Sequence, residues 1–248
     1  MGKEKTANKP EFSIRHPLLY TAAVYIVSFF SVLCIMVVGG LIGISQDFTI
    51  VFGRILVAAV LLYAFRELFP KDRFFTGIRF GLPALVFVLW NIIYNLLTGA
   101  QLASAAGVVS AVFAGLAPAL FEETIFRGIA ISKMEQSGKK PMETLILTSL
   151  LFGLLHLTNI AGMSVINAVV QAGYAIVIGL VFGAIYIRSH DIVTVILLHA
   201  LIDITSNLFV SGGPATTPLL VGFGVLMVIM AAYAIYLVAS MKKEEVSK

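Results

Sequence analysis

Long apolar runs separated by short polar links make up almost the whole chain. The runs occupy residues 18–44, 49–68, 80–98, 104–131, 142–160, 165–187, 192–210 and 217–240. A transmembrane helix needs about 20 predominantly apolar residues. The runs are too continuous for the short alternating segments of an outer-membrane barrel. The pattern therefore predicts an all-α polytopic membrane protein with about eight transmembrane helices.

The runs form a single transmembrane domain at residues 18–241, flanked by polar tails at 1–17 and 242–248. Composition agrees with this organisation, because apolar residue types make up 59% of the chain and charged types 12%. Soluble domains have roughly 45–50% and about 25%, respectively. A soluble globular enzyme and a disordered chain are therefore excluded. The one cysteine, Cys34, cannot form an intramolecular disulfide.

The basic residues predict the orientation of the chain. Loops that face the cytoplasm carry an excess of Lys and Arg. All of the 17 Lys and Arg residues except Arg54 fall on one side of the predicted spans. We therefore expect an integral multi-pass protein, in the cell membrane if the source is prokaryotic, with both tails cytoplasmic. The net charge of +4 reflects this topology, and no nucleic-acid partner is expected. Arg54 is expected to extend toward the nearer membrane surface.

Six ionisable side chains lie inside the apolar runs, where such groups are costly and usually mark a site or an internal pair. They are Glu122, Glu123, Arg127, His156, His199 and Asp203. Glu123 and Arg127 are four residues apart in the favoured order for a helical ion pair. Glu122 then points in another direction without that partner. Helix rise places Glu122, His199 and Asp203 roughly 10–16 Å from the basic ends of their helices, which predicts a site in the cytoplasmic half. His156 comes out deeper, at roughly 24 Å from Lys140, and fits this level only if its helix starts in the cytosol.

These residue types are compatible with two kinds of hydrolytic chemistry. Peptide hydrolysis needs a base for water and a donor for the developing oxyanion, and a free carboxylate with two histidines can supply both. Two histidines and one or two carboxylates could equally hold zinc with an open water position. No H-E-x-x-H signature is present to require zinc. We favour water activated by Glu122 without a required metal or other cofactor. If a divalent zinc is bound, its ligands are expected among Glu122, His156, His199 and Asp203.

The order of these residues resembles a known three-motif pattern. Glu122-Glu123-x-x-x-Arg127, Phe152-x-x-x-His156 and His199-x-x-x-Asp203 are similar to the motifs of the CPBP family (CaaX protease and bacteriocin-processing, or Abi) of intramembrane proteases. The best-known branch of that family is the Rce1-type CaaX prenyl endopeptidases. The resemblance covers about residues 100–210. It implies hydrolysis of a peptide bond inside the lipid bilayer, in a membrane-anchored or lipidated protein or peptide.

The resemblance also implies roles for the six residues. Glu122 is expected to activate water, and His156 to help hold that water. His199 is expected to share this task or to stabilise the oxyanion. Glu123, fixed by Arg127, is expected to orient the site. The last motif position is often Asn in the CaaX-processing branch, whereas this chain has Asp203, whose easier role is to orient His199.

Two other functions remain open from the sequence alone. A non-catalytic bacteriocin-immunity or membrane-scaffold protein could retain the same residues. A proton-coupled transporter could use buried acids and histidines as a relay. Transporters usually show paired repeats with broken helices, and the sequence shows no such repeat, so a transporter is the less favoured of the two.

Overall fold

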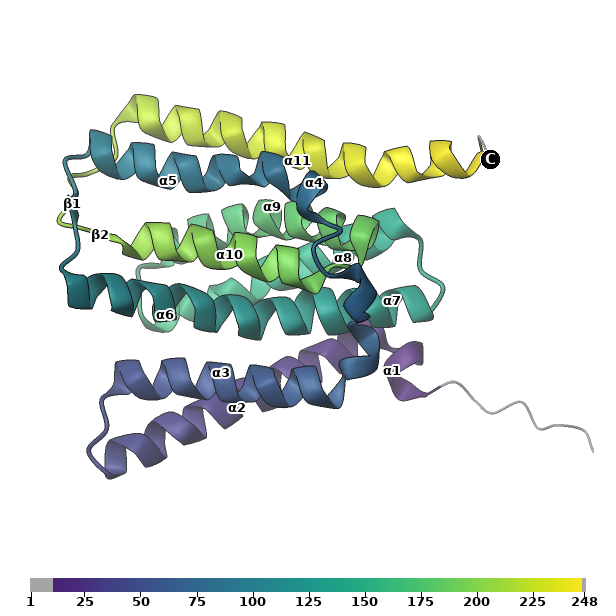
Figure 1. Cartoon of the computed structure of the whole chain (residues 1–248), viewed down its shortest axis with the longest axis horizontal. Coiled ribbons are helices and arrows are strands. Elements are labelled where there is room, and N and C mark those ends of the chain that lie inside the picture. The colour runs from purple at the N-terminus through teal and green to yellow at the C-terminus, as the bar shows by residue number, and fades with distance from the viewer. Residues whose placement is uncertain (1–10, 247–248) are drawn as a thin grey trace, which may run out of the picture.

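The computed structural model describes residues 11–246, with side chains for residues 11–241. The chain forms a bundle of helices that run along one common axis (Figure 1). The helices that traverse the bundle are α2 (Pro17–Leu41), α3 (Gln46–Ala64), α5 (Leu85–Leu97), α6 (Ala105–Glu123), α8 (Pro141–Leu155), α9 (Val165–Ser189), α10 (Ile192–Asn207) and α11 (Thr217–Val246). The all-α prediction is confirmed.

Short elements connect or extend these helices. They are the helices α1 (Phe12–Arg15), α4 (Ile78–Gly81) and α7 (Ser132–Gln136), the 3-10 turns η1 (Arg66–Leu68), η2 (Lys71–Arg73), η3 (Leu82–Ala84) and η5 (His156–Ala161), the π-helix η4 (Thr124–Ile131), and the strands β1 (Gln101–Leu102) and β2 (Phe209–Val210). The strands pair antiparallel, with Gln101 opposite Val210. This pairing ties two links together at one end of the bundle (Figure 1).

Seven candidate spans occur among the described residues, each a helical stretch long and apolar enough to cross a membrane. They agree closely with seven of the eight predicted runs, so the protein is an integral multi-pass membrane protein. The remaining helix, α10, has 16 residues. It rises about 24 Å, which is less than the roughly 30 Å of a hydrocarbon core. A full eighth crossing by α10 stays a prediction.

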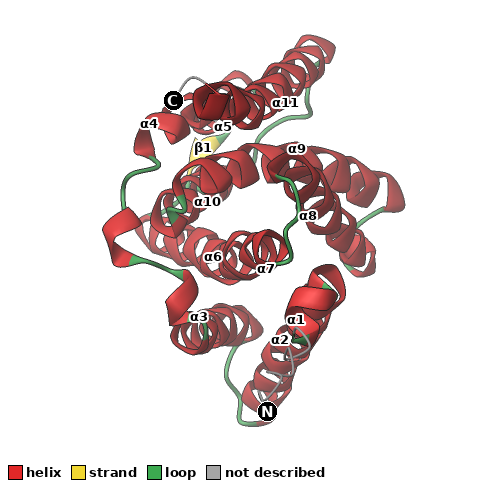
Figure 2. Ribbon diagram, turned by 90° about the vertical axis from the view of Figure 1, so that its right-hand side faces the viewer, coloured by secondary structure: helices red, strands yellow, loops and turns green. Residues whose placement is uncertain are grey.

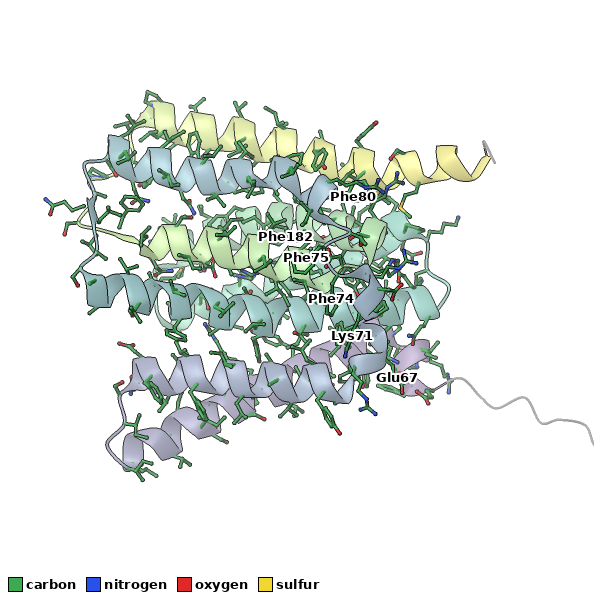
Figure 3. All side chains as sticks on the ribbon, viewed as in Figure 1. Glu67, Lys71, Phe74, Phe75, Phe80 and Phe182 are labelled. Atoms are coloured by element: carbon green, nitrogen blue, oxygen red, sulfur yellow. The ribbon has the colours of Figure 1, made fainter. Side chains whose placement is uncertain are left out.

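The basic links gather at one end of the bundle. Helices α1 and α7 lie at this end, and β1 and β2 lie at the other (Figure 1). Glu67 and Lys71, from the link after α3, lie toward the basic end in Figure 3. The end of α11 also lies there, as an even number of passes requires. Four of the basic residues lie outside the described residues, namely Lys3, Lys5, Lys9 and Lys248. The side chains of Lys242 and Lys243 are also not described. The cytoplasmic orientation of this end stays a prediction.

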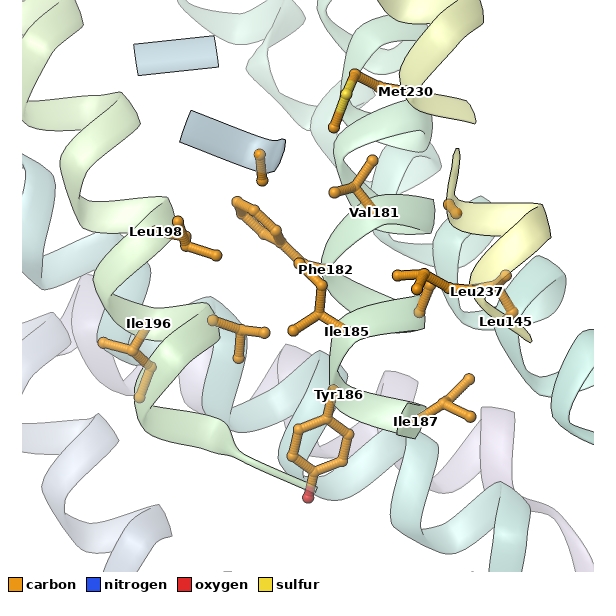
Figure 4. Close-up of a cluster of buried hydrophobic side chains, with 14 of the residues drawn as sticks. Leu145, Val181, Phe182, Ile185, Tyr186, Ile187, Ile196, Leu198, Met230 and Leu237 are labelled. Carbon is orange, nitrogen blue, oxygen red and sulfur yellow. The ribbon is translucent and has the colours of Figure 1, made fainter. Parts of the chain in front are cut away.

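Helix α9 is the most buried of the candidate spans. Half of its most apolar window is buried, against 17% for α2. Seen along the bundle axis, α6, α8, α9 and α10 surround the centre, with α5 and α11 on one side and α2 and α3 on the other (Figure 2). Phe182 and Ile185 of α9 pack in a cluster with Leu198 of α10 and Met230 of α11 (Figure 4). The outer helices instead expose many large apolar side chains, as a lipid-facing layer requires.

Two glycines allow the central helices to approach closely. A Cβ atom at Gly115 of α6 would lie 2.6 Å from the backbone nitrogen of Ile204 in α10. A Cβ atom at Gly179 of α9 would lie 3.2 Å from the Cα atom of Ser149 in α8. Small residues permit this kind of approach between membrane helices. The two crossings bring together the helices that carry the three sequence motifs.

Candidate active site

Helix α6 changes its winding directly after the two adjacent glutamates. The α-helical pattern ends at Glu123, and η4 continues as a π-helix from Thr124 to Ile131. Pro118 lies inside α6, one turn before the glutamates, where it removes a backbone donor. Short π-helical segments inside helices are frequent at functional sites. The sequence predicted one continuous helix over 104–131, and the altered winding is a feature that it did not reveal.

Glu123 and Arg127 form a buried ion pair. Arg127 Nη1 donates to Glu123 Oε1 at 2.8 Å, and the two side chains are 2% and 0% exposed. The guanidinium also lies 4.5 Å from the centre of the Phe152 ring, within cation–π range. The predicted pairing of these two residues therefore exists in the structure. Because both charges are removed from solvent, the pair is fixed by its surroundings and is costly to break.

His199 extends this pair across to α10. Its Nδ1 lies 2.7 Å from the same Oε1 of Glu123 that accepts from Arg127. A carboxylate only accepts hydrogen bonds, so Nδ1 carries a proton in this arrangement. The other ring nitrogen, Nε2, lies 3.5 Å from Asp203 Oδ2. Glu123 therefore holds the ring orientation of His199, and Asp203 lies beside the nitrogen that remains.

Glu122 faces His156 instead. Glu122 Oε2 and His156 Nε2 are 4.0 Å apart, and each side chain is 19% exposed. This distance is too long for a direct hydrogen bond and is compatible with a bridging water. His156 Nδ1 lies 2.9 Å from the backbone oxygen of Phe152, which can only accept, so Nδ1 carries a proton. Nε2 is the ring nitrogen that faces Glu122.

A cavity of about 810 Å³ brings these side chains together. Glu122, His156, His199 and Asp203 line it, as does Phe152. Glu123 and Arg127 are absent from its wall and lie behind it. Four of the six predicted residues thus reach the cavity. The other two form a buried pair that supports His199.

The cavity extends from the middle of the bundle toward the end away from the basic links. Its wall includes α9 residues between Gln171 and Ile178, α10 residues between His199 and Asn207, and α11 residues between Leu219 and Met227. Most residues of these segments belong to the half of their helix nearer β1 and β2, and His199 lies near the middle of α10. Ser206, Asn207 and Leu220 are exposed, so the cavity reaches the surface there.

The depth in the membrane stays a prediction for Asp203, whose place along α10 is given by the structure. It lies 11 residues, or about 16 Å, from Ile192, as the helix rise predicted. However, α10 ends at Asn207, only about 6 Å beyond Asp203. The sequence pattern extended this run to residue 210, whereas residues 209–210 form β2. Asp203 consequently belongs to the half of the helix away from the basic end.

Three further polar features line the cavity, and the sequence did not predict them as part of the site. Arg54 of α3 lines the wall, although it was expected to extend to the membrane surface. Asn159 and Gln171 also line the wall and are hydrogen-bonded at 2.8 Å. Asn91 donates to the backbone oxygen of Ile202 at 3.0 Å and so links α5 to α10. One sign in the sequence marks Arg54 as unusual. It is the only Lys or Arg that falls on the side of the predicted spans opposite to the other sixteen.

The four cavity residues do not assemble as a metal site. Among residues 11–241, whose side chains the structure describes, no three His, Cys, Asp or Glu side chains are placed to hold one ion together. A zinc site with an open position needs three protein ligands around one point. The donor set as placed does not fit zinc.

Comparison with known proteins supports the resemblance that the motifs carry. Residues 103–205 match a family model described as type II CAAX prenyl endopeptidase Rce1-like. The matched segment contains all three motifs and all six site residues predicted from the sequence. The chain has no match among curated proteins or among solved structures. At the level of the family, the match supports a CAAX-protease-like intramembrane endopeptidase.

Proposed function

We propose that the protein is an intramembrane endopeptidase in which Glu122 activates the attacking water. The observation that carries this proposal is the division between the two adjacent glutamates. Glu122 reaches the cavity opposite His156, while Glu123 is wholly buried against Arg127. The substrate is a peptide segment of a membrane-anchored or lipidated protein, and the family match supports this class of substrate.

The first step of the reaction is attack by water on the scissile carbonyl carbon. A water within reach of both Glu122 Oε2 and His156 Nε2 gives one proton to Glu122 and is oriented by the imidazole lone pair. The oxygen of that water forms the new bond to carbon. General-base assistance of this kind typically contributes 10²–10⁴-fold to a rate, roughly.

The second requirement is stabilisation of the oxyanion and protonation of the leaving group. His199 as an imidazolium donates from Nδ1 to Glu123 and from Nε2 into the cavity, where the oxyanion develops. Glu122 then returns its proton to the amine nitrogen as the carbon–nitrogen bond breaks. The products are a carboxylic acid and an amine. Asp203, beside Nε2, and Glu123, beside Nδ1, are positioning residues for His199.

Cleavage of a peptide panel tests this function. The purified protein in detergent is incubated with lipidated and unlipidated peptides, as wild type and as Glu122→Gln, with and without a strong chelator. The control is Glu143→Gln, which changes an exposed glutamate on α8 whose partner is Lys139.

We expect wild type and Glu143→Gln to cut, and Glu122→Gln to cut at least roughly 100-fold more slowly. Equal cleavage by Glu122→Gln would contradict the mechanism. Loss of cleavage in the presence of the chelator would show that the reaction depends on a metal ion and that Glu122 does not activate water on its own. If no protein cuts any peptide and a bacteriocin-protection assay survives Glu122→Gln, the non-catalytic immunity function is favoured instead.

A further inference from the structure

Arg54 places a permanent positive charge in the cavity wall. It lies in α3, an apolar helix whose other charged residue, Asp47, is in the first turn. Among the described residues that line the cavity, Arg54 is the only Arg or Lys. A cation inside a membrane helix is costly, and those that persist usually face a cavity and serve a function.

The surroundings of Arg54 leave its guanidinium available. Within residues 11–241, whose side chains the structure describes, Arg54 makes no hydrogen bond and no ion pair. Asp203 of α10 and Tyr25 of α2 line the same cavity. The guanidinium therefore shares the cavity with the functional groups without being bound to any of them. All five of its donors can be offered to a ligand.

The charges of the cavity wall indicate what kind of ligand this is. Glu122 and Asp203 contribute carboxylates to the same cavity. A substrate carboxylate would be repelled by these two groups unless a cation compensated them. Guanidinium binds carboxylate through two parallel hydrogen bonds, which fixes orientation as well as adding affinity. Arg54 is the group in the wall that can hold an acidic end of a peptide.

We propose that Arg54 binds a carboxylate of the peptide substrate and so sets which bond reaches Glu122. The inference rests on the proposed peptidase function and deepens it by naming the substrate class, a peptide with a carboxylate near the cleavage point. That carboxylate comes either from the free C-terminus or from an Asp or Glu side chain. Arg54 acts as a specificity-determining residue and takes no part in the bond-breaking step.

Binding measurements on inactive protein test the proposal. Glu122→Gln is combined with native Arg54, Arg54→Gln or Arg54→Lys, and fluorescent peptides are titrated in detergent. Each peptide is made in three forms. The first has a free C-terminus, the second has a C-terminal amide, and the third has the amide together with an added glutamate residue. The control is Arg66→Gln, which alters an exposed arginine outside the cavity wall.

With Arg54 present, amidation is expected to weaken binding roughly 10- to 100-fold, the range of a charge-assisted hydrogen bond. With Arg54→Gln, the free and amidated peptides are expected to bind with equal affinity. That affinity should match the affinity of the amidated peptide for protein with native Arg54, and the match would also show that the variant is folded. Arg54→Lys retains part of the difference, and Arg66→Gln retains all of it. Recovery of binding by the added glutamate identifies a side chain as the source, and no recovery identifies the C-terminus.

An equal effect of amidation with Arg54 and with Arg54→Gln would overturn the proposal, as would the absence of any effect in both. Neither result would affect the peptidase function if wild type still cut the panel. Failure of every peptide to bind and to be cut would instead remove the peptidase function, and this proposal with it.

Discussion

Glu122 and Glu123 are neighbours in the chain and have opposite environments. Successive residues of a helix point about 100° apart, so one carboxylate reaches the cavity while the other faces Arg127. The exposed fractions are 19% and 0%. The buried carboxylate connects α6 to His199 on α10, and the accessible one faces His156. One glutamate is therefore suited to chemistry and the other to support.

Removing one member of the buried pair is expected to destabilise the protein strongly. Arg127→Met removes the guanidinium from buried Glu123 and leaves it only the contact with His199, a loss expected to cost about 3–5 kcal/mol. Arg127→Met combined with Glu123→Leu removes both charges and is expected to recover most of that loss. Thermal unfolding in detergent measures both variants.

The double variant still loses activity, because His199 Nδ1 no longer has the acceptor that orients its ring. The peptide panel gives this second readout. A double variant that unfolds as easily as the single one would contradict the ion-pair account. A double variant that is both stable and fully active would contradict the orienting role of Glu123.

Helix crossings bring the three motifs together. The contact of α6 with α10 at Gly115 connects the helices that bear Glu122 and His199. The contact of α9 with α8 at Gly179 fixes the helix that leads to His156. The backbone oxygen of Gly179 also lies 3.5 Å from Arg127 Nη2. The backbone approach leaves no space for a side chain at Gly115, and at Gly179 an added Cβ would be tightly packed against Ser149.

Substitution of Gly115 by alanine tests the α6–α10 crossing. The added methyl would lie 2.6 Å from the backbone nitrogen of Ile204 and 3.0 Å from the backbone oxygen of Ala200, and backbone cannot move aside as a side chain can. We expect a destabilisation of about 1–3 kcal/mol, measured by thermal unfolding, and slower cleavage. Gly173→Ala is the matched control, because nothing lies within 4 Å of its added Cβ. It is expected to be neutral or slightly stabilising. Equal losses in both variants would contradict the role of the crossing.

The sequence predicted the helices well and the contacts between them poorly. Apolar length identifies the spans, and the four-residue spacing identified the pairing of Glu123 with Arg127 because that pair lies within one helix. The bond between Glu123 and His199 joins residues 76 apart in the chain, so no local pattern contains it. The π-helical winding of η4 and the inward position of Arg54 likewise follow from packing. Helix periodicity carries no information about packing between helices.

The whole molecule has two chemically different ends. The basic links lie at the end with α1 and α7, and the cavity opens in the half nearer β1 and β2. If the basic end is cytoplasmic, as the distribution of Lys and Arg predicts, the cavity is reached from the opposite side of the membrane. The substrate segment would then enter from outside the cytoplasm.

Cysteine labelling tests this orientation. In a Cys34→Ser background, single cysteines are introduced at Thr216 in the link after β2, at Ser206 in the cavity wall, and at Lys139 in the link after α7. A membrane-impermeant maleimide is then applied to intact cells. We expect labelling of Thr216→Cys and Ser206→Cys in intact cells, and of Lys139→Cys only after permeabilisation. The reverse pattern would show that the basic end is external and that the cavity opens to the cytoplasm.

The central claim is that Glu122 activates water and does not itself attack the substrate. Single-turnover cleavage in water labelled with oxygen-18, followed by mass spectrometry of the product and of the Glu122-containing fragment, tests it most directly. The account predicts labelled oxygen in the new carboxyl group of the product and none in Glu122. Labelled oxygen in the side chain of Glu122 would mean that this carboxylate forms a covalent intermediate, which contradicts the account.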